Sequence, residues 1–280
     1  MNTWQGRGRA ASSEQFERDG TLAAGGTRPC APLCVQGTVA WLEPNQAGWR
    51  TGSASLFRGD GVETAILGVG MSRRHRKTIN PFRVQLQVQR PDWAAIMGDM
   101  ERPIEVDLGF GRGEFLLEKA LREPEVQFVG IEIRAYLIEA MRKRLAQDPR
   151  PNVYLVAANV KLHLPILFDP GMVRRFYVHF PDPWTKRKKH HKRRMVDADL
   201  VTALYTLLEP GGEVHLMTDK EVVGLEMRAL FKAHGGFVNA CGEGLFCPSS
   251  TTGVRTREEL YYINRGDPVY RLQFVCDRRA

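Results

Sequence analysis

Residues 104–116 read IEVDLGFGRGEFL, and the fold follows from this stretch. A largely apolar run suited to a strand leads into Gly109, Gly111 and Gly113, which permit a tight turn and let a ligand approach the backbone closely. The helix expected after the turn offers N–H groups at its N-terminus. The stretch therefore predicts a strand, a ligand-binding turn and a helix, which together open an α/β fold.

A second short strand is expected at residues 128–133, and it ends in an acid. In nucleotide-binding folds an acid at this place, Glu132 here, binds ribose hydroxyls. Asp107 lies two residues before the first glycine, where a turn that cradles phosphates would avoid a carboxylate. A cofactor with a positively charged amino-acid end would favour it, so the pattern favours S-adenosylmethionine over NAD. The alternatives are a turn-forming role for Asp107 and a surface position for Glu132.

Strand and helix patterns alternate along the rest of the chain. A third strand at residues 152–158 leads into Asn159, which is expected either to contact an adenine edge or to form a turn. The other expected elements are helices at 136–145, 195–208 and 222–231 and strands at 175–180, 213–217 and 269–275. This rhythm predicts a Rossmann-like, doubly wound and mostly parallel sheet with an antiparallel late strand.

The fourth strand delivers the sequence FPDPW, residues 180–184, to the carboxyl edge of the sheet. Ligands of open α/β sheets bind at that edge. Because proline fixes φ and restricts the residue before it, Asp182 is held on a stiff loop between two prolines. We expect Asp182 to act on a ligand, and the alternative is an acid that caps the turn. Trp184 is expected either to stack on a base or to brace the loop.

A basic run follows at residues 186–194, with seven Lys or Arg and two His. Such a run binds phosphates or forms a solvated surface, and its position between an apolar strand and an apolar helix favours the first. The net charge of +8 resides entirely in residues 71–280, which points to nucleic acid as the partner. Binding should then weaken steeply with salt. His190 and His191 lack accompanying acids or thiols, so no metal site is expected.

Residues 1–70 have a different composition from the rest of the chain. They hold 12 of the 27 glycines, six basic and six acidic residues, and little periodicity. We expect this segment to be a disordered or dispensable extension, with the folded domain at 71–280. No apolar run approaches the ~20 residues of a membrane span, and no signal-peptide pattern is present. The five cysteines lack paired spacing, which disfavours a disulfide framework and favours the cytoplasm.

The chain resembles the tRNA (guanine-N7-)-methyltransferase family over roughly residues 72–275. The motifs that carry the resemblance are DLGFGRGEF (107–115), GIEIR (130–134), FPDPWTKRKKHHKRR (180–194), LEPGG (208–212), TD (218–219), TREE (256–259) and GDPVYR (266–271). The glycine turn alone indicates only a class I methyltransferase, whereas FPDPW followed by a basic run is specific to this family. The resemblance implies methyl transfer from S-adenosyl-L-methionine to N7 of a guanine in tRNA, expected at position 46 in the variable loop. We expect a cytoplasmic protein that is a monomer or homodimer, with no obligatory partner subunit.

The resemblance also implies roles for single residues. Cofactor contacts are implied at Asp107, Gly109, Gly111, Gly113, Glu132, Asn159 and Asp182. Substrate contacts are implied at Lys186, Asp219, Thr256, Arg257, Glu258 and Glu259. Contacts to the tRNA backbone are implied at Arg187, Lys188, Lys189, Lys192, Arg193 and Arg194. The sequence departs from the family pattern where Asp107 replaces a frequent Glu, Asn159 replaces a frequent bacterial Asp, and Glu258 replaces an aromatic residue.

Guanine N7 has an available lone pair, so methyl transfer to it needs alignment and electrostatics and no proton abstraction. Asp182 is the expected catalytic residue, because a fixed carboxylate would stabilise the positive charge that develops on the purine. Asp219 and Glu259 could accept hydrogen bonds from the guanine N1 and N2 donors. Two alternatives remain: a methyltransferase for another RNA or a small molecule, and a catalytically idle RNA-binding protein. An idle protein would have no use for the acids of a cofactor pocket.

Overall fold

The structure, a computed structural model, describes residues 86, 88–184 and 192–278. The expectation for residues 1–70 lies outside this part of the chain. The elements are α1 (Trp93–Met97), β1 (Ile104–Leu108), α2 (Glu114–Arg122), β2 (Gln127–Glu132), α3 (Ala135–Gln147), β3 (Val153–Ala157), α4 (Val160–Leu167), β4 (Val173–His179), α5 (Ala198–Leu207), β5 (Leu208–Thr218), α6 (Glu221–His234), β6 (Phe237–Asn239), α7 (Arg257–Asn264) and β7 (Tyr270–Cys276).

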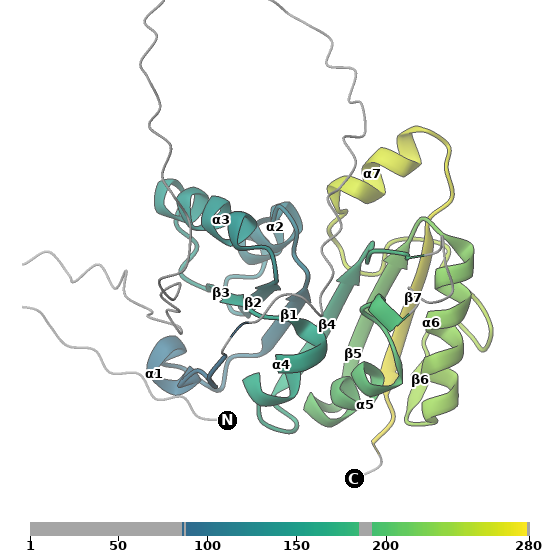
Figure 1. The fold of residues 1–280 in the computed structure, drawn as a ribbon, viewed down its shortest axis with the longest axis horizontal. Coiled ribbons are helices and arrows are strands. Elements are labelled where there is room, and N and C mark those ends of the chain that lie inside the picture. The colour runs from purple at the N-terminus through teal and green to yellow at the C-terminus, as the bar shows by residue number, and fades with distance from the viewer. Residues whose placement is uncertain (1–85, 87, 185–191, 279–280) are drawn as a thin grey trace, which may run out of the picture. The chain divides into compact units, whose positions relative to one another are not determined.

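The strands form one seven-stranded sheet in the order β3-β2-β1-β4-β5-β7-β6 (Figure 1). The five strands from β3 to β5 in that order are parallel, and β7 runs antiparallel to both β5 and β6. The chain winds outward from β1 in one direction and from β4 in the other. This Rossmann-like, doubly wound and mostly parallel sheet with an antiparallel late strand confirms the fold expected from the sequence.

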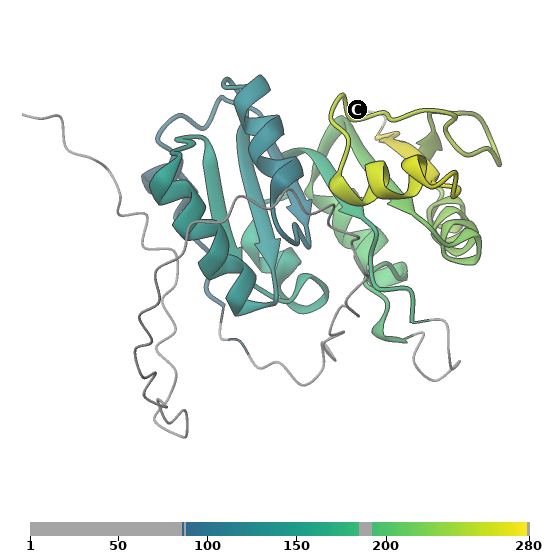
Figure 2. The ribbon, with the colours of Figure 1, turned by 90° about the horizontal axis from the view of Figure 1, so that it is seen from above.

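Helices cover both faces of the sheet (Figures 1 and 2). The larger apolar cluster packs α1, α4, α5 and α6 against one face. A second cluster packs α2 and α3 against β2 and β3 on the other face. The parallel strands β1 and β2 are buried along their whole length, as expected for strands covered on both sides.

Several elements differ from the sequence predictions. The helix α1 was not among the elements expected from the sequence, and Asp92 caps its N-terminus by accepting a hydrogen bond from Ala95 N. Three further elements, α4, β6 and α7, were not expected at all. The strand β5 is longer than expected because it begins at Leu208, which pairs with Val173 before a register shift.

Candidate active site

The switch point of the sheet lies between β1 and β4, and the expected glycine turn leaves β1 there. Gly109, Gly111 and Gly113 all have φ between 61° and 81°, a region that side chains with a Cβ rarely adopt. Gly109 N donates to Ile131 O at 2.7 Å, which holds the turn against the end of β2. At Gly111 a Cβ would meet nothing nearer than 3.9 Å, so the turn faces open space there.

Glu132 ends β2 as expected, and its carboxylate is almost fully buried. One oxygen accepts a hydrogen bond from Gly111 N at 3.2 Å, so Glu132 connects the second strand to the glycine turn. Arg134 also binds this carboxylate, with Nη2 2.7 Å from Oε2 and Nε 2.9 Å from Oε1. A ribose hydroxyl that binds the Glu132 carboxylate would therefore replace one of the two Arg134 hydrogen bonds.

A pocket joins the ends of β1, β2, β3 and β4. Its lining includes three of the expected cofactor acids and amides, Glu132, Asn159 and Asp182, together with Gly109. Asn159 is the N-cap of α4, and its side chain accepts a hydrogen bond from Lys161 N at 3.1 Å. The ends of the parallel strands thus bring together residues up to 73 positions apart in the sequence, Gly109 to Asp182, which no local pattern links. Sequence reasoning missed other lining residues: Arg134, Lys161, His179 and Met195.

Asp107 is buried at the end of β1, one residue before the lining residue Leu108. Burial, and then the charges of Glu132 and Glu258, raise the pKa of Asp107 to about 8. Asp107 therefore lies near two other acids: Glu132, which lines the pocket, and Glu258 in the first turn of α7. A cation at this place would favour the ionised form of Asp107, so these acids fit a cofactor with positive sulfonium and ammonium groups.

The loop that carries Asp182 is strained at both ends. Phe180 and Trp184 have φ values of 47° and 43°, which are uncommon for residues other than glycine. Phe180 is buried, its N donates to Met217 O at 2.8 Å, and its ring stacks on Tyr262 of α7 at 5.5 Å. These contacts fix the first half of the loop, and Asp182 lines the cofactor pocket from it.

The first turn of α7 holds the expected substrate residues. Thr256 caps the helix by accepting a hydrogen bond from Glu259 N at 3.0 Å. Glu259 is 0% exposed and pairs with Arg271 at 2.8 Å, while its Oε2 has no hydrogen-bond partner among the described residues. Arg257 lies 3.8 Å from Glu114 of α2.

Asp219 follows β5 and forms an ion pair with Lys220 at 2.9 Å. Burial disfavours its charge, but hydrogen bonds from Lys220 and Tyr262 lower the pKa of Asp219 below its ordinary value. Asp219 therefore stays ionised beside the ring that stacks on Phe180. The two expected substrate acids differ in access, because Glu259 is enclosed whereas Asp219 is only partly buried.

The basic run is only partly described. Lys186, Arg187, Lys188 and Lys189 lie outside the described residues, and Lys192 is exposed. The guanidinium of Arg193 lies 5.0 Å from the ring centroid of Trp184, so Trp184 braces the loop in this structure. Arg194 differs from the expectation, since its side chain is 9% exposed and pairs with Glu226 of α6. A buried, paired guanidinium is not presented to a tRNA backbone, which corrects the expected role of Arg194.

The cysteines also differ from the expectation. Cys241 and Cys247 form a disulfide, and the remaining described cysteine, Cys276, is buried as a thiol. The spacing of the pair gave no signal because both residues lie in a loop whose path is set by α6 and β7. No helix in the described ranges is long and apolar enough to cross a membrane.

The sequence is similar to known methyltransferases. A family model described as "Putative methyltransferase" matches residues 101–272. The chain is 38% identical over 203 residues to a tRNA (guanine-N(7)-)-methyltransferase of Thermosynechococcus vestitus, an alignment that covers 72% of this chain and 94% of the relative. A protein of the same name from Myxococcus xanthus is 33% identical, with 66% of this chain and 88% of the relative covered. The crystal structure of the aminoglycoside resistance methyltransferase NpmB1 is similar at 20% identity and a TM-score of 0.47, covering 68% of this chain and 95% of that chain.

Proposed function

The chain belongs to the tRNA (guanine-N(7)-)-methyltransferase family, and we propose that it transfers a methyl group from S-adenosyl-L-methionine to N7 of a guanine in tRNA. The guanine at position 46 of the variable loop is the proposed target. Family membership supports S-adenosyl-L-methionine as the cofactor. We further propose that the protein acts in the cytoplasm as a monomer or homodimer.

One observation carries the proposal: Gly109 of the glycine turn, Glu132, Asn159 and Asp182 line a single pocket. Glu132 and Asn159 would hold the ribose and adenine, and Asp107 with Glu258 would face the positive end of the cofactor. When bound, the cofactor supplies a methyl group on a positively charged sulfur. The acidic side chains Asp107, Glu132 and Glu258 therefore match a cationic nucleoside better than a dinucleotide with its negatively charged phosphates.

The residues of this chain would align and stabilise the reacting groups. No residue needs to remove a proton from N7, because its lone pair is available. Asp182 would orient the guanine and stabilise the positive charge that develops on it. Asp219 would accept from the donor edge of the base, whereas Glu259 would contribute through Arg271 and the start of α7. Lys192 and the preceding basic residues would hold the tRNA backbone.

The test incubates the purified protein with labelled S-adenosylmethionine and a set of tRNA transcripts, then maps the product by cleavage at 7-methylguanosine. A single cut in the variable loop is the expected result. Incorporation of label without that cut would support methyltransferase activity but reject N7 of guanine as the methylated atom. Tight tRNA binding without methyl incorporation would favour an RNA-binding protein. If the protein neither binds tRNA nor incorporates label, tRNA is rejected as the substrate.

The substitution Asp182→Ala should lower turnover by about 100- to 1,000-fold, because it removes a preorganised charge from the reacting base. The affinity for tRNA should remain, since the basic residues that contact phosphates are unchanged. Single-turnover methylation and filter binding measure the two quantities. Asp199→Ala, at an exposed acid in the first turn of α5, is the matched control. Near-normal turnover in Asp182→Ala would refute the catalytic assignment.

A further inference from the structure

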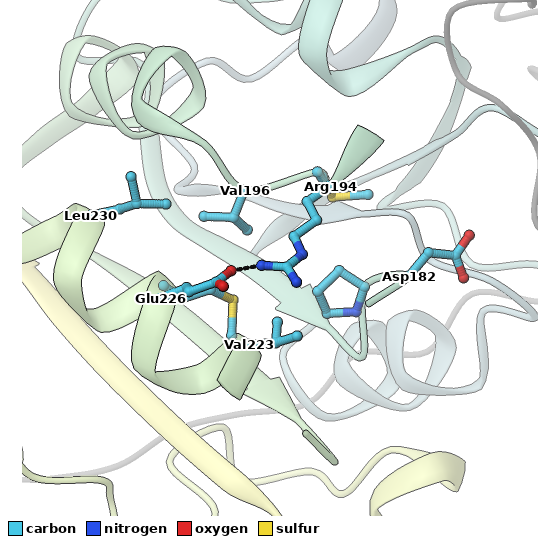
Figure 3. A pocket seen from close by; sticks show the side chains of 9 residues that line it. Asp182, Arg194, Val196, Val223, Glu226 and Leu230 are labelled. Carbon is cyan, nitrogen blue, oxygen red and sulfur yellow. Dashed lines mark ion pairs between the residues drawn. The ribbon is translucent and has the colours of Figure 1, made fainter. Parts of the chain in front are cut away.

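Arg194 joins the second half of the Asp182 loop to helix α6. Its Nε donates to the carbonyl of Pro183 at 2.8 Å, one residue after Asp182. Its Nη1 forms an ion pair with Glu226 (Figure 3). The Arg194 guanidinium thus binds the loop backbone through Nε and helix α6 through Nη1.

The surroundings of Arg194 favour one fixed position for this side chain. Val196, Val223, Met227 and Leu230 line the small cavity around it. Figure 3 shows the Arg194 side chain directed toward Glu226 while the carboxylate of Asp182 points away from it. Arg194 therefore contacts the loop through its backbone, and Asp182 itself lines the larger pocket.

The loop requires such a restraint because its conformation is strained at Phe180 and at Trp184. Phe180 is held by burial, by Met217 and by Tyr262, but Trp184 is only half-buried. The restraints near Trp184 are Arg193, which packs on the ring, and Arg194, which binds the preceding carbonyl. Without Arg194, the half of the loop that follows Asp182 would lose its connection to α6.

We propose that Arg194, fixed by Glu226, is a positioning residue that sets the place of Asp182 for methyl transfer. This inference rests on the proposed function of the site. It gives Arg194 a role within the protein, whereas its place in the basic run predicted a contact with tRNA. It also assigns a role to Glu226, which lies on α6 and has no place in the motifs.

The test compares Arg194→Ala and Glu226→Ala with the unchanged protein. Both variants should lose about 10- to 100-fold in kcat, because small displacements of a catalytic group are costly. The Kd for tRNA and its salt dependence should stay unchanged in both. Arg194→Lys should recover part of kcat, since it keeps a charge facing Glu226. Lys232→Ala, which removes an exposed charge of α6 paired with Glu243, is the matched control and should leave kcat unchanged.

Hydrogen exchange at the amides of Asp182 and Trp184 supplies a readout that does not depend on turnover. Exchange should be faster in both alanine variants, while thermal unfolding reports that they remain folded. Arg194→Ala is expected to fold because the Glu226 side chain is 41% exposed and can be hydrated without its partner. In Glu226→Ala, Arg194 keeps its hydrogen bond to the carbonyl of Pro183, and thermal unfolding measures the cost of its lost ion pair.

Two results would overturn the proposal. One is an Arg194→Ala variant with unchanged kcat and exchange but weaker tRNA binding and a salt slope reduced by about 0.9, the value for one lost phosphate contact. The other is a Glu226→Ala variant with unchanged kcat and exchange. If the unchanged protein does not methylate tRNA at all, the proposed function fails, and the exchange measurement still decides whether Arg194 and Glu226 hold the loop.

Discussion

Asp107 is held beside two other carboxylates, Glu132 and Glu258, in a place that water reaches poorly. Burial opposes the charge of Asp107 most strongly, and the charges of Glu132 and Glu258 oppose it further. In the protein without cofactor, Asp107 therefore keeps its proton up to a pH of about 8. Binding a cation reverses this balance, because the ionised carboxylate then gains a partner.

The affinity for S-adenosylmethionine should consequently rise between about pH 6 and pH 8. Below the pKa of about 8, cofactor binding must displace a proton from Asp107, and above that pKa it need not. Isothermal titration across this range measures both Kd and the number of protons released. Asp107→Asn removes the titrating group and corrects for titration of the cofactor itself. Identical pH profiles for the two proteins would exclude Asp107 as the linked group.

Single residues could be predicted where a rule about position applied. Glu132, Asn159 and Asp182 follow the ends of parallel strands, and strand ends meet at one edge of a sheet. Arg134 and Arg194 carried no such signal. Each is the last, basic residue of a motif, and only the ion pairs with Glu132 and with Glu226 of α6 show that these charges are used within the protein. A basic residue read from sequence alone is assigned to the solvent or to RNA.

At the scale of elements, α2 packs closely on β2 because Gly130 has no side chain. A Cβ at Gly130 would lie 2.6 Å from Leu116 Cδ2 and 2.8 Å from Phe110 Cδ1, and both side chains are buried. The glycine turn and α2 are therefore held against the strand that carries Glu132. This contact links the second-strand sequence GIEIR to the geometry of the pocket.

Gly130→Ala should lower the free energy of unfolding by about 1–3 kcal/mol, because the added methyl group overpacks this contact. Urea unfolding followed by circular dichroism measures the change. The double variant Gly130→Ala with Leu116→Ala is the control, since truncation of Leu116 opens the space that the methyl group needs. It should lose less than the sum of the two single changes. Strict additivity would show that the two side chains do not meet.

Periodicity predicted the long elements and failed for the short ones. The helix expected at 136–145 is found as α3, Ala135–Gln147. In contrast, α4 is eight residues long and contains Pro165, and β6 has three residues. Such elements are stabilised by tertiary packing: the buried residues Val160, Leu164 and Leu167 of α4 join the main core. Their own sequences are too short to show a period.

At the scale of the whole molecule, charge and similarity both concentrate after the first 70 residues. Residues 1–70 carry equal numbers of basic and acidic residues, so they add nothing to the net charge of +8. The match to the family model begins at residue 101. The relative from Thermosynechococcus vestitus is covered over 94% of its length by 72% of this chain. A complete relative therefore corresponds to only part of this sequence.

A variant that begins at Met71 should fold and methylate tRNA with kcat and tRNA Kd within about twofold of the full chain, a free-energy difference below about 0.5 kcal/mol. The reason is that the cofactor pocket, the Asp182 loop and the whole excess of positive charge lie within residues 71–280. Thermal unfolding, methyl transfer and filter binding of both proteins measure the comparison. A variant that loses tRNA affinity while keeping its melting temperature would assign a binding role to residues 1–70. A variant that cannot fold would show that the domain begins earlier than Met71.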